Sequence, residues 1–197
     1  MLIAMPSPRP RRFVMRRHGA AITAAGVLTL VLSGCVGAPA NTPSPSPSVS
    51  AEPVFASDEE ALAAAEAAYR SFEEVSALIA SESGNDAERI EAVATPTYTV
   101  QLLDEFAQYR ALGIRAEGQT ALDSFSLVQQ QTTAAGSEVV IYVCRDVGDV
   151  RVRDASGADV TPLDRASRTP LIATLVAGDG ARFLVDGVEL WSGEDFC

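Results

Sequence analysis

The chain has 197 residues, of which 47% are hydrophobic and 21% are charged, and its formal net charge is −11. This length suits one domain of ordinary size together with shorter accessory segments. The acidic balance repels phosphate groups, so we expect no nucleic acid or anionic lipid surface to bind through a basic patch. The sequence contains no lysine, which excludes Schiff-base chemistry, and its single histidine is His18.

Residues 1–34 are predicted to form a signal peptide that the mature protein lacks. Arginines between Arg9 and Arg17 form a basic start, and the apolar run from Ala20 to Leu32 follows it. At about 1.5 Å per helical residue, that run is too short for a hydrocarbon core of about 30 Å, which argues against a membrane-spanning helix. Neither pair of adjacent arginines in this basic start stands in a full twin-arginine motif, so export by the general secretory route is favoured. Met15 is an alternative to Met1 as the first residue of the signal peptide.

Leu32, Ser33, Gly34 and Cys35 end the apolar run with small residues and a cysteine. This stretch resembles the lipobox of bacterial lipoproteins. The resemblance implies that Cys35 becomes the first mature residue and carries a diacylglyceryl group, which anchors the protein on the extracytoplasmic face of the cell membrane. Cleavage would also remove His18, which excludes serine–histidine, cysteine–histidine and Cys/His zinc sites from the mature chain.

Residues 35–56 are predicted to form an unfolded linker between the lipid and the domain. The segment interleaves prolines with serines and offers almost nothing apolar to bury, so it cannot offset the entropy of ordering. Alternating Ser-Pro favours polyproline II, which extends about 3.1 Å per residue. We therefore expect a spacer that holds the domain away from the membrane.

Residues 57–197 are predicted to form one domain that begins with three helices. Ser57 and Glu60 form a capping box, and apolar residues then recur every three or four positions as far as Ile79. A short helix is expected from Asp86 to Ala94, with Asp86 as its cap. The third should start at Thr95-Pro96, with threonine as the cap and proline in the first turn, and end near Gly113.

After Gly118 the period of the apolar residues changes from helical to alternating, which predicts antiparallel strands. The expected strands cover residues 122–131, 138–145, 150–153, 171–177 and 182–191, and the last two form a hairpin around Gly178-Asp179-Gly180. Turn residues at Asp154 to Gly157 end the third strand. Helices followed by strands indicate an α+β domain in which the helices pack on one face of a curved antiparallel sheet.

This order of elements, the segment from Tyr142 to Asp146 and the terminal Cys197 are similar to the nuclear transport factor 2-like superfamily and, more narrowly, to uncharacterised actinobacterial lipoproteins. The resemblance implies a cone-shaped domain, with a long first helix in the hollow of the sheet and a cavity beneath it. Within that cavity we expect four tyrosines, three phenylalanines and one acid: Tyr69, Tyr98, Tyr109, Tyr142, Phe72, Phe106, Phe125 and Asp123.

These residues leave three classes of function open. The favoured interpretation is a non-catalytic ligand-binding or accessory domain, whose cavity would hold a small apolar ligand. A carboxylate- and tyrosine-based isomerase or dehydratase would need Asp123 or another acid deep in that cavity. An envelope interaction module would fill the cavity and expose an apolar patch. No metal or cofactor is expected, because the acids from Asp146 to Asp159 lack a twelve-residue calcium loop.

The strongest structural expectation is a disulfide between Cys144 and Cys197. With Cys35 lipidated, two cysteines remain in an oxidising compartment, and Cys197 is the last residue. The bond would hold the tail beyond Trp191 against the sheet. The alternative is a free buried thiol at Cys144 and an intermolecular or idle Cys197.

Overall fold

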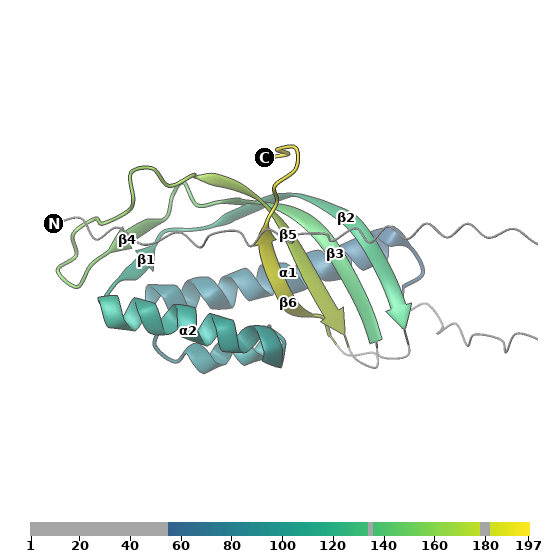
Figure 1. Ribbon diagram of the computed structural model, residues 1–197, viewed down its shortest axis with the longest axis horizontal. Helices are drawn as coiled ribbons and strands as arrows, with labels where there is room; N and C mark the ends of the chain where they lie inside the picture. The colour runs from purple at the N-terminus through teal and green to yellow at the C-terminus, as the bar shows by residue number, and fades with distance from the viewer. Residues whose placement is uncertain (1–54, 134–135, 178–181) are drawn as a thin grey trace, which may run out of the picture. The chain divides into compact units, whose positions relative to one another are not determined.

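The computed structural model describes residues 55–133, 136–177 and 182–197. The predicted signal peptide, the lipobox with Cys35 and nearly all of the predicted linker therefore lie outside the described residues, as does Gly178-Asp179-Gly180. Within the described ranges, no helix combines the length and apolar character needed to cross a membrane. Figure 1 shows the arrangement of the elements described below.

Helix α1 (Asp58–Ser81) begins and ends close to its predicted limits. Ser57 is its N-cap, and the Ser57 hydroxyl accepts a hydrogen bond from the Glu60 backbone N–H at 3.3 Å. The Glu60 carboxylate accepts a hydrogen bond from the Ala56 N–H, one residue earlier than a capping box requires. These local bonds satisfy backbone donors at the helix start, which explains why the sequence alone located it.

A 3₁₀ helix, η1 (Ala87–Ala92), stands where the second helix was predicted. The predicted cap is wrong: Asp86 adopts a left-handed conformation, and its side chain makes no capping hydrogen bond. The turn before η1 packs closely on the third helix, because a Cβ on Gly84 would lie 2.1 Å from the Phe106 carbonyl oxygen. Glycine is therefore required at position 84.

Helix α2 (Pro96–Leu112) confirms the third predicted helix, with Thr95 as N-cap and Gly113 as C-cap. The Thr95 hydroxyl accepts a hydrogen bond from the Tyr98 N–H and donates one to Asp186. Gly113 adopts the left-handed conformation that glycine favours at helix ends. Thr95 thus joins the start of α2 to the last strand.

The main sheet has four antiparallel strands in the order β2-β3-β5-β6. Hairpin pairing joins β2 (Ala121–Thr133) to β3 (Gly136–Asp146), and the pairing of Val176 with Leu184 confirms the predicted hairpin of β5 (Arg168–Ala177) and β6 (Leu184–Leu190). Irregular register interrupts β2 near Ser124, which has a positive φ of 55°. The structure is therefore α+β, as predicted, with a sheet that does not close into a barrel.

A separate two-stranded sheet corrects the prediction that all strands belong to one curved antiparallel sheet. The expected strand at 150–153 exists as β4 (Arg151–Arg153), but it pairs with β1 (Arg115–Glu117) and not with the main sheet. Figure 1 shows this pair apart from the four longer strands. The sequence did not predict β1, because three residues are too few to establish an alternating pattern.

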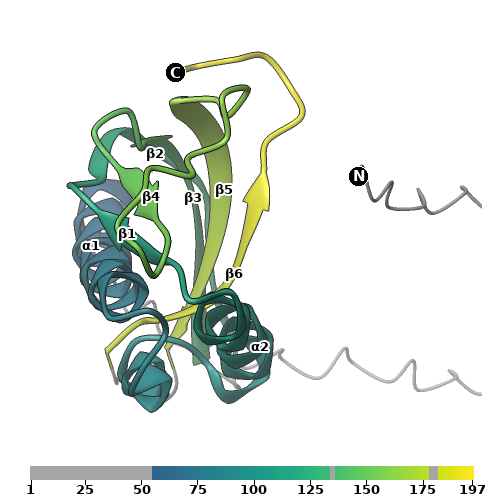
Figure 2. The same cartoon turned by 90° about the vertical axis from the view of Figure 1, so that its left-hand side faces the viewer.

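The hydrophobic core lies between α1 and one face of the curved main sheet, hereafter the inner face (Figure 2). Strand β3 contributes Val139, Ile141 and Val143 to this core, whereas Tyr142 and Cys144 alternate onto the opposite, outer face. Phe55 stacks on Phe183 at the edge of the core, with ring centroids 5.5 Å apart. The helices of the described residues thus lie on the inner face.

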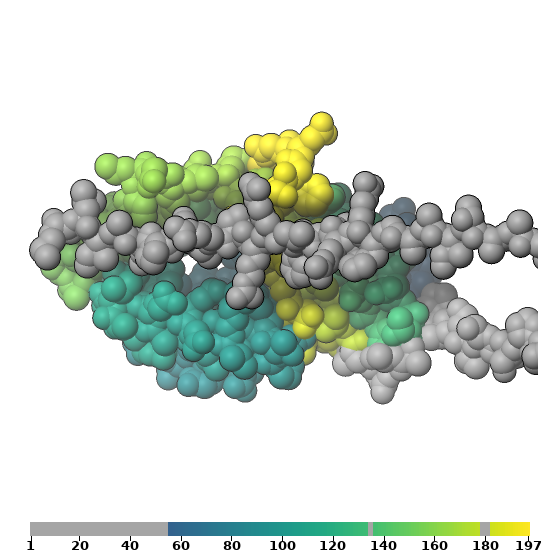
Figure 3. Space-filling model, viewed as in Figure 1, coloured from purple at the N-terminus to yellow at the C-terminus, as the bar shows by residue number. Residues whose placement is uncertain are grey.

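The C-terminal segment covers part of the outer face. A disulfide joins Cys144 to Cys197, with the two Cα atoms 5.4 Å apart, as the sequence predicted. The Tyr142 ring contacts Trp191 and Phe196, with centroid distances of 4.8 and 5.2 Å. In the space-filling view, this yellow segment projects on the side away from the teal surface of α2 (Figure 3).

Candidate ligand-binding cleft

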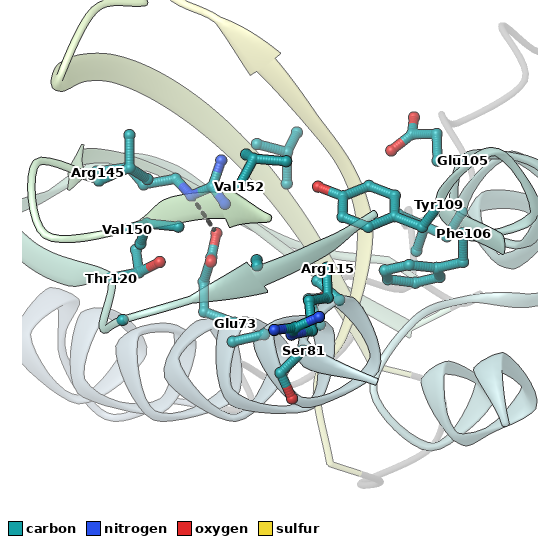
Figure 4. A pocket seen from close by; sticks show the side chains of 18 of the residues that line it. Glu73, Ser81, Glu105, Phe106, Tyr109, Arg115, Thr120, Arg145, Val150 and Val152 are labelled. Carbon is teal, nitrogen blue, oxygen red and sulfur yellow. Dashed lines mark ion pairs between the residues drawn. The ribbon is translucent and has the colours of Figure 1, made fainter. Parts of the chain in front are cut away.

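A cleft of about 850 Å³ lies between α1, α2, the inner face of the main sheet and the β1–β4 pair. Part of its lining is drawn in Figure 4. Its volume falls in the range of small-molecule pockets. The apolar and aromatic part of the lining comprises Phe72, Ala77, Ala80, Tyr98, Leu102, Phe106, Tyr109, Ala116, Val147, Val150, Val152, Pro162, Leu171 and Val188.

Helix α2 supplies the aromatic wall of the cleft. Tyr98, Phe106 and Tyr109 recur at helical spacing, so one face of α2 presents all three rings. The Phe106 and Tyr109 rings make an edge contact at 6.4 Å, and Tyr98 stacks on Phe72 of α1 at 6.0 Å. These contacts hold the rings in place before any ligand arrives, which lowers the entropy lost on binding.

Burial changes the chemistry of Tyr98 in the cleft and of Tyr69 in the core behind it. Burial, followed by the charge of Glu105, raises the pKa of Tyr98 to about 12. Burial, followed by the charge of Glu73, raises the pKa of Tyr69 beyond the usual range of tyrosine. Both side chains are therefore neutral phenols near neutral pH, able to donate a hydrogen bond but unsuited to act as a base.

Glu73 is the buried carboxylate of the site, and the sequence analysis did not select it. It lies on α1 four residues after Tyr69, whose hydroxyl donates a hydrogen bond to Glu73 Oε1 at 3.1 Å. Arg145 Nε of β3 lies 3.2 Å from the same oxygen, and Figure 4 marks this ion pair. The Glu73 side chain is 10% exposed and that of Arg145 42%, so the pair joins the core to the open cleft. Its position between Tyr69 and Ile79 on the apolar stripe of α1 was the available signal.

A second arginine, Arg165, lines the cleft from the connection between β4 and β5. One of its terminal nitrogens donates hydrogen bonds to the carbonyls of Val147 and Val150 at 2.9 and 2.8 Å. Within the described part of the chain, no carboxylate forms an ion pair with Arg165, whereas Arg115 pairs with Glu117 and Arg145 with Glu73. Arg165 is thus a fixed cation whose charge stays available to a ligand.

One further polar group in the lining lacks a partner. The Ser76 hydroxyl of α1 is buried and makes no hydrogen bond to any described residue. Buried hydroxyls ordinarily have partners, so this group favours an additional donor or acceptor in the cleft. Together with Arg145, Arg165 and the other polar residues of the lining, among them Glu105 and Gln101, it gives the cleft polar contact points beside its apolar walls.

The predicted cavity residues divide into two groups. Phe72, Tyr98, Phe106 and Tyr109 line the cleft. The other four do not: Tyr69 is fully buried behind Phe72, and Phe125 packs at its edge against Tyr69, with the guanidinium of Arg70 above its ring. β2 pairs irregularly with β3, so its side chains do not keep the regular alternation between the two faces of the sheet that the sequence predicts.

Asp123 and Tyr142 belong to the outer face of the main sheet. Asp123 accepts hydrogen bonds from Arg168 at 3.0 and 3.1 Å, which is the main reason that its pKa lies below the usual value. Tyr142 contacts Trp191 and Phe196. Asp123 therefore cannot serve as the buried acid that an enzyme in this cleft would use.

Three of the acids between residues 146 and 159 have local structural partners. Asp146 contacts Arg168, Asp154 accepts hydrogen bonds within its own turn, and Asp159 lies near Arg151 and Arg153. Within residues 55–133, 136–177 and 182–197, no three or more His, Cys, Asp or Glu side chains are grouped so that they could hold a metal ion.

Comparison with known proteins adds a distant likeness in fold. No protein-family model matches the chain, and no curated protein matches it either. Among solved structures, the intermembrane space region of the chloroplast protein ARC6 is similar, with a TM-score of 0.49 and 12% sequence identity. The likeness covers 67% of this chain and 97% of that chain. At this identity, the role of that protein does not extend to this one.

Proposed function

We propose that the protein is a lipid-anchored extracytoplasmic binding protein whose cleft holds a small, mainly apolar ligand with one anionic group. The observation that carries the proposal is the cleft of about 850 Å³, with aromatic rings of α2 on one wall and the unpaired cation Arg165 among its lining. The rings would bury the apolar part of the ligand, and the guanidinium would bind its carboxylate.

The anchor is proposed from the sequence. The basic start, the short apolar run and Leu32-Ser33-Gly34-Cys35 support lipidation at Cys35 and a place on the outer side of the cell membrane. The disulfide between Cys144 and Cys197 agrees with export to an oxidising compartment. On this proposal, residues 35–56 are the spacer between lipid and domain.

We also infer that the domain is related to the nuclear transport factor 2-like superfamily. The long first helix packed against a curved antiparallel sheet supports this inference. The main sheet is open, and the separate β1–β4 pair adds to one side of the domain. This pair supplies Ala116 and Val152 to the lining of the cleft.

Binding is favoured over catalysis because of the state of Glu73. An acid or base catalyst in this cleft would use that carboxylate, yet Tyr69 and Arg145 both contact its Oε1 oxygen. These two contacts fix the position of the carboxylate within the packed part of the domain. A carboxylate enzyme is the alternative, and turnover abolished by Glu73→Gln without loss of ligand binding would support it.

The test is a thermal-unfolding screen of the protein against aromatic and medium-chain carboxylates, each paired with its uncharged amide. We expect the carboxylates to raise the melting temperature and Arg165→Gln to weaken their binding about tenfold, the usual loss for a charged hydrogen bond. Binding of the amides should change little. No shift with any member of the panel contradicts the proposal and favours an interaction module.

A matched pair of variants tests the location of binding. Ala77 of α1 lines the cleft, whereas Ala67 is an exposed residue of the same helix outside it. We expect Ala77→Trp to block binding by filling the cleft and Ala67→Trp to leave binding unchanged. Equal effects of the two variants would place the ligand elsewhere.

A further inference from the structure

A second, smaller pocket lies on the outer face of the main sheet, away from the cleft. It is a shallow, open pocket of about 420 Å³, and its walls come from β2, β3 and the C-terminal segment. Its lining consists of three aromatic residues, two acids and two serines, namely Tyr142, Trp191, Phe196, Glu194, Asp195, Ser124 and Ser126. No cationic side chain is among these lining residues.

The aromatic rings of this pocket are held by the fold. Trp191 Nε1 donates a hydrogen bond to the Glu194 carbonyl at 3.1 Å, and its ring lies so close to Gly193 that a Cβ there would be 2.3 Å from Cζ2. The other rings are fixed through Tyr142, which contacts both Trp191 and Phe196. Next to Phe196, the disulfide of Cys197 fastens the segment to the sheet.

The charges around these rings are negative. Asp195 uses one carboxylate oxygen to accept the Cys197 N–H, which leaves the other free, and Glu194 lies beside it in the lining. Arg168 approaches the same end of the chain and donates to the Cys197 carbonyl, but Asp123 and Asp146 both bind it. The site therefore presents aromatic rings together with uncompensated carboxylates.

We infer that this pocket binds a small alkylammonium group, such as the trimethylammonium head of choline. The negative faces of aromatic rings attract a cation within about 6 Å, and quaternary ammonium groups bind in aromatic cages because their hydration is weak. Two carboxylates add a longer-range attraction. The inference is independent of the proposed function of the cleft, which lies on the other face and carries the opposite free charge at Arg165.

The sequence provides its own reporter for a test, because Trp191 is the single tryptophan. Choline and tetramethylammonium are titrated into the purified full chain while tryptophan fluorescence is measured, with 3,3-dimethylbutanol as the neutral isostere of choline. We expect saturable changes with both cations and at least about fivefold weaker binding of the alcohol. No response to either cation, or equal binding of choline and the alcohol, would overturn the inference.

Variants then locate the site. We expect Tyr142→Leu to weaken choline binding about fivefold or more, and Glu194→Gln to weaken it by a smaller factor because its carboxylate is exposed. Glu189→Gln, an exposed position on β6 outside the pocket, is the matched control. Since Tyr142→Leu removes core-like contacts, its fold is checked by near-ultraviolet circular dichroism and by the intact disulfide. The site would be refuted if Glu194→Gln binds choline unchanged and Tyr142→Leu is folded and also binds choline as the parent does.

The same head group occurs free and in zwitterionic lipids, and a further arm separates these sources. Flotation with phosphatidylcholine vesicles is compared with phosphatidylglycerol vesicles, for the parent chain and for Tyr142→Leu. Choline-lipid binding that Tyr142→Leu lowers identifies a membrane head group as the occupant. Choline binding in solution with no such difference in flotation identifies a soluble amine.

Discussion

At the scale of single residues, the contact of Glu73 with Tyr69 and Arg145 is the main link between core and cleft. Its carboxylate is buried, and two partners, Tyr69 and Arg145, contact the same one of its oxygens. Removal of one member of such a pair costs more than removal of both, because a buried charge without a partner is poorly solvated. This asymmetry makes the pair testable.

We expect Arg145→Met to lower the free energy of unfolding by about 2 kcal/mol, less than for a fully buried pair because Arg145 is partly exposed. Adding Glu73→Gln should restore most of that loss, since glutamine keeps an acceptor for Tyr69 and carries no charge. Urea denaturation of the two single variants and the double variant measures the coupling. Additive losses would show that the ion pair contributes nothing.

The raised pKa of Tyr98 predicts a loss of stability in alkali. Folding raises this pKa from 10.0 to about 12, so the folded state holds the phenol proton more tightly than the unfolded chain does. The contribution is complete below pH 10 and is lost as the pH rises towards 12. We expect the urea midpoint to fall across this window and to fall less steeply in Tyr98→Phe. Identical pH profiles for the two proteins would contradict this assignment.

At the scale of elements, the ends of the helices were predictable and the arrangement of the short strands was not. The capping residues Ser57, Thr95-Pro96 and Gly113 act on backbone groups within one helical turn. Their effect can therefore be predicted from neighbouring residues in the sequence. β1 forms only because β4 lies beside it, and Asp86 adopts a left-handed conformation that its residue type does not reveal. Tertiary partners decide such features.

Thr95 joins two elements, and its replacement tests that connection. We expect Thr95→Ala to lower the free energy of unfolding by about 1–2 kcal/mol, because both the N-cap of α2 and the bond to Asp186 are lost. Thr95→Ser keeps the hydroxyl and should cost much less. Chemical denaturation gives both values, and an equally large loss in Thr95→Ser would assign the effect to the methyl group.

The disulfide makes a similar prediction for the C-terminal segment. Its bond spans a sequence separation of 53 residues, for which loss of chain entropy in the unfolded state predicts up to about 4 kcal/mol of stabilisation. We expect Cys197→Ser to lose a large part of this stabilisation. Intact-mass spectrometry after alkylation without reductant should find no reactive thiol at Cys144 in the parent. Alkylation of the parent at Cys144 would contradict the bond.

At the scale of the whole molecule, the sequence predicted the α+β class and the partners of the disulfide, but only four of the eight predicted cavity residues line the cleft. Phe72, Tyr98, Phe106 and Tyr109 were found because helical spacing assigns a face directly. Asp123 and Tyr142 were placed wrongly, since a strand pattern gives alternation but does not say which face meets the helices. Glu73 escaped notice among 26 acidic residues.

The proposed anchor predicts where the whole molecule is found. We expect Cys35→Ala to move the protein out of the membrane fraction or to leave it as an unprocessed precursor, because the lipid would have no attachment site. Membrane fractionation and precursor size, measured with and without a globomycin-type inhibitor, give the answer. An unchanged fraction and size under both treatments would disprove lipidation at Cys35.

The same disulfide also governs how the molecule bears tension. A pull applied between the N-terminal part and Cys197 passes through the sulfur atoms to Cys144, so β5 and β6 lie outside the stretched path. At about 3.6 Å per extended residue, the 53-residue separation withholds about 190 Å of contour length from the unfolding chain. Under oxidising conditions, the chain that can be extended by the pull is therefore much shorter than the full sequence. The strands between the two cysteines bear no load.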